Sequence, residues 1–191
     1  RRCRWYTAGQ IGWTDPLLLR YGTTSQGDVT RKARIYTREE HGIPAESIDP
    51  DAVWAIRRLA EAGHRAYIVG GAIRDLLLGK KPKDFDVATD AQPNRIRRIF
   101  RRSRIIGRRF RLVHLYFENG KIIEVSTFRA GGEGASSNIY GTLAEDVMRR
   151  DYSLNALFYD PAKEQLIDYV DGLRDVRRRR LRILAPPADS F

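Results

Sequence analysis

The sequence predicts an α+β fold in which a mixed or antiparallel sheet is flanked by helices. Short apolar runs alternate with amphipathic stretches in the order β-α-β-α-β-β, and further helices follow. Asn119-Gly120 separates two alternating segments, which is the strongest short-range signal of a β-hairpin. Hydrophobic residues make up 42% of the 191 residues, which is enough to bury a core. No apolar run approaches the roughly 18 residues that a membrane span needs.

The first regular element is expected at residue 49. Residues 1–48 contain many turn-forming residues and no sustained hydrophobic period, so we interpret them as an N-terminal extension of unknown role. Asp49 can cap a helix whose first position is Pro50, and Gly63 can end that helix. Four residues are expected on its apolar face, namely Val53, Ile56, Leu59 and Ala60.

Strands and helices are expected to alternate along the middle of the chain. The apolar runs, helical periods and glycines predict a strand over 66–69, a helix over 72–79, a strand over 84–89, a helix over 93–102 and strands over 111–118 and 121–129. The last two strands flank Asn119-Gly120 and are therefore expected to pair as a hairpin.

The C-terminal part is expected to add a loop and further helices. Residues 130–141 are rich in glycine and serine, which predicts a loop. Residues 143–161 predict a helix, a turn that carries Asp151, a second helical turn and a short strand. Residues 165–184 predict a strand, an Asp-Gly turn, a basic helix and a last strand.

The charge balance favours a polyanionic partner. Basic residues exceed acidic ones by 35 − 24 = 11, and the pI is near 10.1. Such an excess attracts nucleic acid or phosphates through counterion release, although a basic surface without a partner would show the same balance. The single cysteine, Cys3, excludes an internal disulfide and a zinc site built from cysteines. A reducing, cytoplasmic setting is the default expectation.

Asp84 and Asp86 form the first candidate site. Residues i and i+2 of a strand point to the same face, so these two carboxylates share a face while Phe85 and Val87 point into the core. Two negative charges on one face are unfavourable unless a cation lies beside them, and carboxylate oxygens suit Mg²⁺. The alternative, a turn with two solvated aspartates, is the commoner meaning of an isolated Asp-x-Asp.

A phosphate site is suggested just before this pair. Gly70-Gly71 joins a strand to a helix, where the backbone can approach a phosphate closely, although such a turn needs glycine in any case. Arg74 lies one turn into that helix and can reach the same phosphate. Asp75 is expected to pair with Arg74 or to cap a neighbour.

Glu124 is the third candidate carboxylate. It shares a strand face with Ile122 and Ser126, either toward solvent or as a buried functional group. If this strand pairs beside residues 84–89, three carboxylates converge, which is the geometry that a two-metal phosphoryl-transfer site requires.

Nine arginines lie between Arg95 and Arg111. A solvated helix face explains the first part of this run. It explains GRRFR less well, where Arg108, Arg109 and Arg111 precede a strand and suggest an anion site that we assign to RNA. The later run 177–180 is interpreted as an RNA-facing or solvated surface.

These residues resemble a known family. AYIVGGAIRDLLLGKKPKDFDVATDA and RRDYSLNALFYDP resemble the two signature motifs of the class II tRNA nucleotidyltransferase and bacterial poly(A) polymerase family, within the DNA polymerase β-like superfamily. IIGRRFRLVHLYF resembles the segment that separates bacterial poly(A) polymerases from CCA-adding relatives. The resemblance implies a nucleotidyltransferase catalytic head over residues 49–184, with 185–191 as the start of a truncated neck.

The resemblance also implies roles for the matching residues. Asp84 and Asp86 would hold Mg²⁺ in a two-metal site, with Glu124 as the third acidic member. The incoming nucleotide would be held by Gly70, Gly71, Arg74, Arg150, Asp151 and Asn155, with Asp151 near the ribose and counted among the catalytic residues.

The implied reaction is the addition of AMP from ATP to the 3′ end of an RNA, either mRNA or tRNA. Two alternatives stay open, a CCA- or A-adding tRNA nucleotidyltransferase and a truncated, non-catalytic RNA-binding head. Members of the family continue into a base-selecting motif and a helical neck and body beyond the point where LAPPADSF ends.

Overall fold

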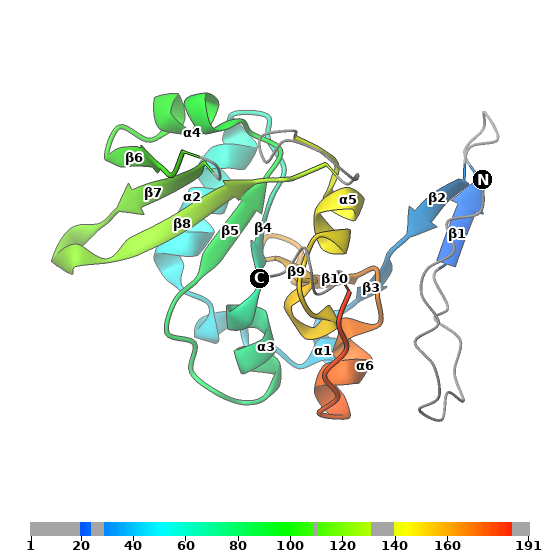
Figure 1. Ribbon diagram of the computed structural model, residues 1–191. Coiled ribbons are helices and arrows are strands. Elements are labelled where there is room, and N and C mark those ends of the chain that lie inside the picture. The colour runs from blue at the N-terminus through cyan, green and yellow to red at the C-terminus, as the bar shows by residue number, and fades with distance from the viewer. Residues whose placement is uncertain (1–19, 24–28, 109–110, 131–139, 185–191) are drawn as a thin grey trace.

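An eight-stranded mixed sheet organises the molecule, with strand order β3-β10-β9-β4-β5-β8-β7-β6 (Figure 1). The structure, a computed structural model, describes residues 20–23, 29–108, 111–130 and 140–184. Neighbouring strands of this sheet are antiparallel except β5 and β8, which are parallel. The predicted α+β class with a mixed, helix-flanked sheet is confirmed.

The strands follow one another as a series of short elements. They are β3 (Arg34–Tyr36), β4 (Ala66–Val69), β5 (Asp86–Thr89), β6 (Ser103–Ile106), β7 (Leu112–Tyr116), β8 (Ile122–Thr127), β9 (Leu157–Asp160) and β10 (Gln165–Asp168). A separate antiparallel pair is formed by β1 (Arg20–Thr23) and β2 (Val29–Lys32).

Short helices connect these strands. The α-helices are α1 (Arg38–His41), α2 (Pro50–Glu61), α3 (Gly71–Leu77), α4 (Pro93–Ile99), α5 (Leu143–Met148) and α6 (Gly172–Arg177). Single 3₁₀ turns occur at η1 (Ala45–Ser47), η2 (Glu118–Gly120) and η3 (Ser153–Asn155). Among the described residues, no helix combines the length and apolar content that a bilayer crossing needs.

Helix α2 begins as its sequence predicts. The Asp49 carboxylate accepts hydrogen bonds from the backbone N–H groups of Asp51 and Ala52, and Pro50 occupies the first turn. Its buried face is Ala52, Ala55, Ile56 and Leu59. The expected position of Ala60 on that face is wrong, because the buried stripe is centred between Ala52 and Leu59, and Ala60 lies about a quarter of a turn away on the exposed side.

Order begins before the expected residue 49. Strand β3 pairs with β10 at one edge of the sheet, and Tyr36, His41 and Ile43 are buried. The partner strand of β3 lies near the other end of the chain, so no local pattern announces this pairing. At the C-terminal end, the expected last strand is reduced to one bridge between Tyr152 and Ile183. Some predictions concern residues outside the described ones, namely 1–19, 24–28, 131–139, 185–191 and Arg109.

Each face of the sheet packs against its own hydrophobic core. One core joins alternate strand residues such as Val87 and Val125 to α2, α3 and α4, and α2 lies behind the strands in Figure 1. The other core joins Val69, Ala88 and Phe158 to α5. Because side chains alternate along a strand, Asp86 lies on the same face as Ala88. The candidate carboxylates therefore belong to the α5 face.

Candidate functional site

The parallel pairing of β5 and β8 brings the candidate carboxylates together. Asp86 lies directly opposite Glu124 in the register, so both side chains share the α5 face of the sheet. Asp84 lies just before β5 and is exposed. The pairing that the three-carboxylate prediction required is thus present in the structure.

The electrostatics of this group disfavour an isolated Asp86 anion. Burial is the largest cause that raises the pKa of Asp86, and the negative charges of Glu124 and Asp84 raise it further. The Arg150 guanidinium acts in the opposite direction. A cation placed at this point would relieve the repulsion.

The carboxylates at this site are of the chemical type that binds a hard divalent cation. Only carboxylate oxygens are offered, and Mg²⁺ commonly takes one or two protein carboxylates together with substrate phosphates. The described residues contain no ready-made cluster of three or more ligating side chains. Instead, Glu124 Oε1 lies 3.3 Å from His114 Nε2 on the neighbouring strand β7. The chemistry of these donors fits Mg²⁺.

Gly70 lies between the carboxylates and the basic side of the site. Its φ of +75° belongs to the region that side-chain-bearing residues rarely adopt. A Cβ built there would lie 3.7 Å from both Asp86 Oδ2 and Arg150 Nη1. The turn from β4 to α3 therefore needs glycine for its conformation, and it brings bare backbone beside both charged groups.

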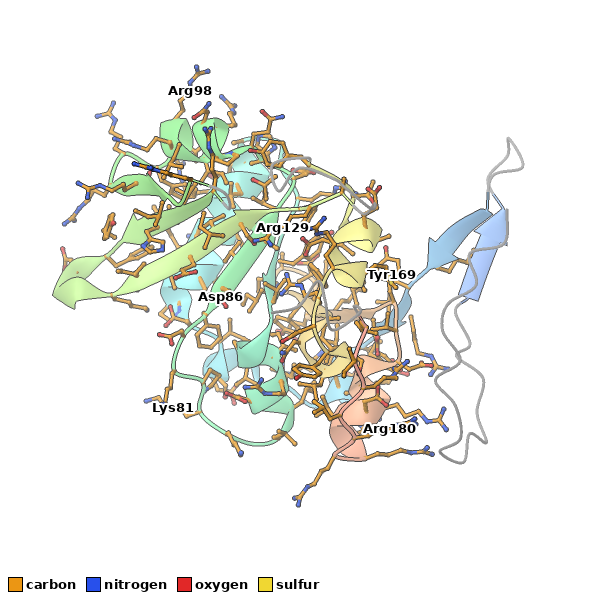
Figure 2. The ribbon with its side chains drawn as sticks, viewed as in Figure 1. Lys81, Asp86, Arg98, Arg129, Tyr169 and Arg180 are labelled. Carbon is orange, nitrogen blue, oxygen red and sulfur yellow. The ribbon has the colours of Figure 1, made fainter. Side chains whose placement is uncertain are left out.

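A cavity of about 260 Å³ opens on this face. Its lining includes three carboxylates and three guanidinium groups, from Asp86, Glu124, Asp146, Arg129, Arg149 and Arg150, together with Ser126 of β8. Asp86 and Arg129 both lie near the centre of the view in Figure 2. The cavity could therefore accept a cation beside its carboxylates and an anion beside its arginines.

The basic side is organised around Asp146, which is buried in α5. Its carboxylate accepts a hydrogen bond from Arg150 Nη2 at 3.0 Å and another from the Arg129 backbone N–H at 3.1 Å. The Arg150 guanidinium lies over the Phe158 ring, 5.1 Å from its centroid. Arg149 donates to the Ala130 carbonyl at 3.1 Å. These contacts hold the guanidinium groups of Arg149 and Arg150 in place before any ligand binds.

Crowding of positive charge marks this side as an anion site. Burial is the main cause that lowers the pKa of Arg129, and the charges of Arg149 and Arg150 lower it further while Asp146 opposes them. Guanidinium groups that crowd together in this way can bind an anion such as a polyphosphate.

The remaining predicted nucleotide residues form a second polar chain. Arg74 binds Asp75 through Nη2 at 2.8 Å and donates from Nη1 to Asn155 Oδ1 at 3.0 Å. Asn155 Nδ2 in turn donates to Asp151 Oδ1 at 3.1 Å. The predicted pairing of Arg74 with Asp75 is confirmed. This series of hydrogen bonds joins α3 to η3 and fixes the orientation of the Arg74, Asn155 and Asp151 side chains.

Close packing against α6 holds η3 in position. A Cβ on Gly172 would lie 2.3 Å from the Ser153 carbonyl oxygen, so only glycine allows this approach. The Ser153 hydroxyl donates to Asp175 at 2.6 Å, and Arg182 Nε donates to the same carboxylate at 2.8 Å. Asn155 is therefore anchored from the C-terminal part of the chain.

Comparison with known proteins places this arrangement in a family. Residues 66–182 match the family described as Poly A polymerase head domain. The chain belongs to this family. The matched range contains both motifs that carried the resemblance, and the relatives include poly(A) polymerases and CCA-adding enzymes, so membership does not by itself choose between the two.

Several relatives of this family can be compared in detail. Poly(A) polymerase I of Salmonella typhi is 44% identical over 173 residues, covering 82% of this chain and 37% of the relative. A CCA-adding enzyme of Bacillus velezensis is 36% identical over 142 residues, covering 71% and 35%. The crystal structure of the Bacillus stearothermophilus CCA-adding enzyme in complex with CTP aligns with 72% of this chain and 34% of that one, at 36% identity and a TM-score of 0.64. The chain thus spans little more than a third of these relatives.

Of the arginines predicted to bind RNA, the described ones do not line the cavity, although Leu112 beside Arg111 does. Arg108 and Arg111 are exposed at the turn between β6 and β7, and Arg109 is outside the described residues. Sequence reasoning also missed residues that the structure brings to the site, namely Arg129, Asp146, His114 and Gly172. For Arg129 a signal was available, since it lies two residues after β8, the strand that carries Glu124.

Proposed function

We propose that this chain is the catalytic head of a template-independent RNA nucleotidyltransferase that adds AMP from ATP to RNA 3′ ends. The observation that carries the proposal is the pairing of Asp86 with Glu124 in a cavity that three arginines also line. The 44% identity with poly(A) polymerase I supports AMP as the nucleotide added.

In the proposed reaction the RNA 3′-hydroxyl oxygen attacks the α-phosphorus of ATP. A new phosphodiester bond forms, the bond between the α-phosphorus and its bridging oxygen breaks, and pyrophosphate leaves. The hydroxyl proton passes to the carboxylate of Glu124, which acts as the base. Little covalent chemistry is asked of the protein, so its contribution is positioning and charge stabilisation.

Asp84 and Asp86 are the proposed ligands for Mg²⁺, with Glu124 as the third acidic residue. When bound in pairs at such a site, Mg²⁺ supplies charge stabilisation for the attacking and leaving oxygens. Asp86 is suited to this role because it is held opposite Glu124 and half-buried, where its unpaired charge is unfavourable.

Two sets of residues are proposed to bind the nucleotide. Arg129, Arg149 and Arg150 face the cavity and would bind phosphates, and Gly70 and Gly71 would bring backbone close to them. Arg74, Asp151 and Asn155 form the polar chain at η3, where Asp151 would meet the ribose. Arg108, Arg109 and Arg111 are proposed to contact RNA beyond the cavity.

Nucleotide-addition assays test this function. The 191-residue chain would be incubated with Mg²⁺ and either ATP or CTP, on oligo(A) and on a tRNA that ends before CCA. Addition of AMP to oligo(A), lost in Asp86→Asn, is the expected result. Robust incorporation of CTP would refute the poly(A) assignment.

A CCA-adding activity is the second candidate, because CCA-adding enzymes are among the relatives and one was solved with CTP. Ordered use of CTP and then ATP on the shortened tRNA would establish it. The third candidate is an RNA-binding head without catalysis. RNA binding without any addition, unchanged in Asp84→Ala/Asp86→Ala, would favour that candidate.

A further inference from the structure

A row of side chains crosses four strands on the α5 face. The registers place Arg104 of β6 opposite His114 of β7, His114 opposite Glu124 of β8, and Glu124 opposite Asp86 of β5. Residues directly opposite each other in a sheet share a face, so these four side chains form one line. The line runs from a basic residue at the sheet edge to the carboxylates of the site.

A second row lies beside the first. Tyr116 of β7 is opposite Ile122 of β8, and its backbone N–H donates to the Arg102 carbonyl. Tyr116 is 37% exposed and Ile122 is 40% exposed. The intervening Leu115 is buried in the core of the opposite face. Strand alternation therefore presents Tyr116 on the same side as His114.

The two rows have the composition of a single-strand nucleic-acid surface. The His114 and Tyr116 rings meet edge to face, with centroids 6.3 Å apart. Arg102 and Arg104 are exposed, and among the described residues neither guanidinium makes a hydrogen bond or ion pair. The exposed Tyr116 ring beside these two arginines suits base stacking combined with phosphate neutralisation.

The size and direction of this surface fit the end of an RNA. Three strand spacings of about 4.8 Å separate β6 from β5, roughly 14 Å in all. At about 3.4 Å per phosphate of a stacked strand, that distance accommodates about four nucleotides. The surface leads directly to Glu124 and Asp86, where the proposed reaction needs a 3′-hydroxyl.

We propose that the exposed α5 face of β6, β7 and β8 binds the 3′-terminal nucleotides of single-stranded RNA. Tyr116 stacks on a base, and Arg102 and Arg104 neutralise phosphates. The inference rests on the proposed function and extends it by naming Tyr116, Arg102 and Arg104 as residues that hold the RNA. Unpaired positive charge and continuity with the carboxylates favour RNA over a protein partner for this face.

RNA binding can be measured without the reaction. Fluorescence anisotropy of a 5′-labelled 15-nucleotide oligo(A), without Mg²⁺ or nucleotide, would be recorded for the 191-residue chain across a salt series. Tyr116→Ala is expected to weaken binding by about 5- to 100-fold, and Tyr116→Phe to leave it within twofold, because base stacking needs the ring. Arg102→Ala/Arg104→Ala should reduce the slope of log affinity against log salt by about 1.4, at ~0.7 per phosphate contact.

The chain offers a matched control for charge. Arg95 and Arg98 are exposed on α4, which packs against the opposite core, and Arg98 points away from Asp86 in Figure 2. Arg95→Ala/Arg98→Ala removes the same charge and should leave the salt slope and affinity near the wild-type values. Thermal unfolding of each variant would show that it is folded.

The outcomes separate this inference from the proposed function. RNA binding that is unchanged in Tyr116→Ala and Arg102→Ala/Arg104→Ala, or reduced equally in the α4 control, would overturn the inference even if the chain adds nucleotides. A shift in oligomeric state with unchanged RNA binding would overturn it in favour of a protein interface. Variant-specific loss of RNA binding in a chain that adds no nucleotide would uphold the RNA surface and refute the proposed activity.

Discussion

Replacing Asp86 with asparagine should stabilise the protein in the absence of divalent metal. Burial, Glu124 and Asp84 all raise the pKa of Asp86, which means that the ionised side chain is disfavoured in the folded state. Asparagine keeps the size of the side chain and removes its charge. A residue retained for catalysis at the expense of stability is expected to respond in this way.

The expected gain in the free energy of unfolding is about 1 kcal/mol. Asp86 and Glu124 are directly opposite on neighbouring strands, and like charges in that arrangement destabilise a sheet by up to ~1 kcal/mol. Relief of the Asp86 desolvation adds to this gain, and loss of the favourable Arg150 interaction reduces it. For a chain of this size, about 1 kcal/mol shifts Tm upward by roughly 2–4 °C.

Thermal unfolding in EDTA and in a Mg²⁺ series measures the effect. The Tm of the wild-type chain should rise with Mg²⁺ by mass action, and that of Asp86→Asn should not. Glu46→Gln is the control, because Glu46 is exposed on η1 and its substitution removes one negative charge elsewhere on the surface. If Asp86→Asn unfolds at a lower temperature than the wild type in EDTA, the carboxylate makes a structural contact and the reasoning is refuted.

Three further predictions concern the same region. The pKa of Asp86 is raised above 3.8 in the folded state, so the wild type should lose stability relative to Asp86→Asn as the pH rises from 3.8 through that raised pKa. Urea unfolding at several pH values would measure this loss. A difference in unfolding free energy between the two proteins that stays constant with pH would contradict the prediction. Gly172→Ala should lower the free energy of unfolding by about 1–3 kcal/mol, since its Cβ would lie 2.3 Å from the Ser153 carbonyl; an unchanged urea midpoint would disprove the clash. Arg129→Ala should weaken ATP binding by about 10- to 100-fold, as loss of a charged hydrogen bond does, whereas a change below twofold in equilibrium binding would remove Arg129 from the anion site.

Local chemistry made much of the fold predictable. The Asp49 cap, the strand before Gly70 and the Asn119-Gly120 hairpin depend on neighbours in the sequence, and each appears where its pattern placed it. The edge strand β3 was missed because its partner β10 lies far along the chain. Its stabilisation comes from tertiary pairing, which no hydrophobic period within three residues can indicate.

The site was predictable in residue types but not in arrangement. Asp86 and Glu124 meet because β5 pairs in parallel with β8. The sequence alone did not determine that these two strands are neighbours. Arg129 escaped because its role depends on the approach of α5, which brings Asp146 and Arg150 beside it. Sequence motifs therefore marked the charged residues, and the topology determined which of them face one cavity.

The opposed charges of the cavity predict that metal and nucleotide bind cooperatively. Arg150 now lowers the pKa of Asp86 and so compensates part of the carboxylate repulsion. A triphosphate bound to the arginines would offset that compensation, and the carboxylates would then favour a cation more strongly. ATP should therefore increase Mg²⁺ affinity and Mg²⁺ should increase ATP affinity by the same factor. Because Mg²⁺ and ATP also associate in solution, the same measurement on Asp86→Asn gives the apparent coupling that does not depend on the carboxylate. If the variant and the wild type show equal coupling between Mg²⁺ and ATP binding, the carboxylates and the arginines of the cavity act independently.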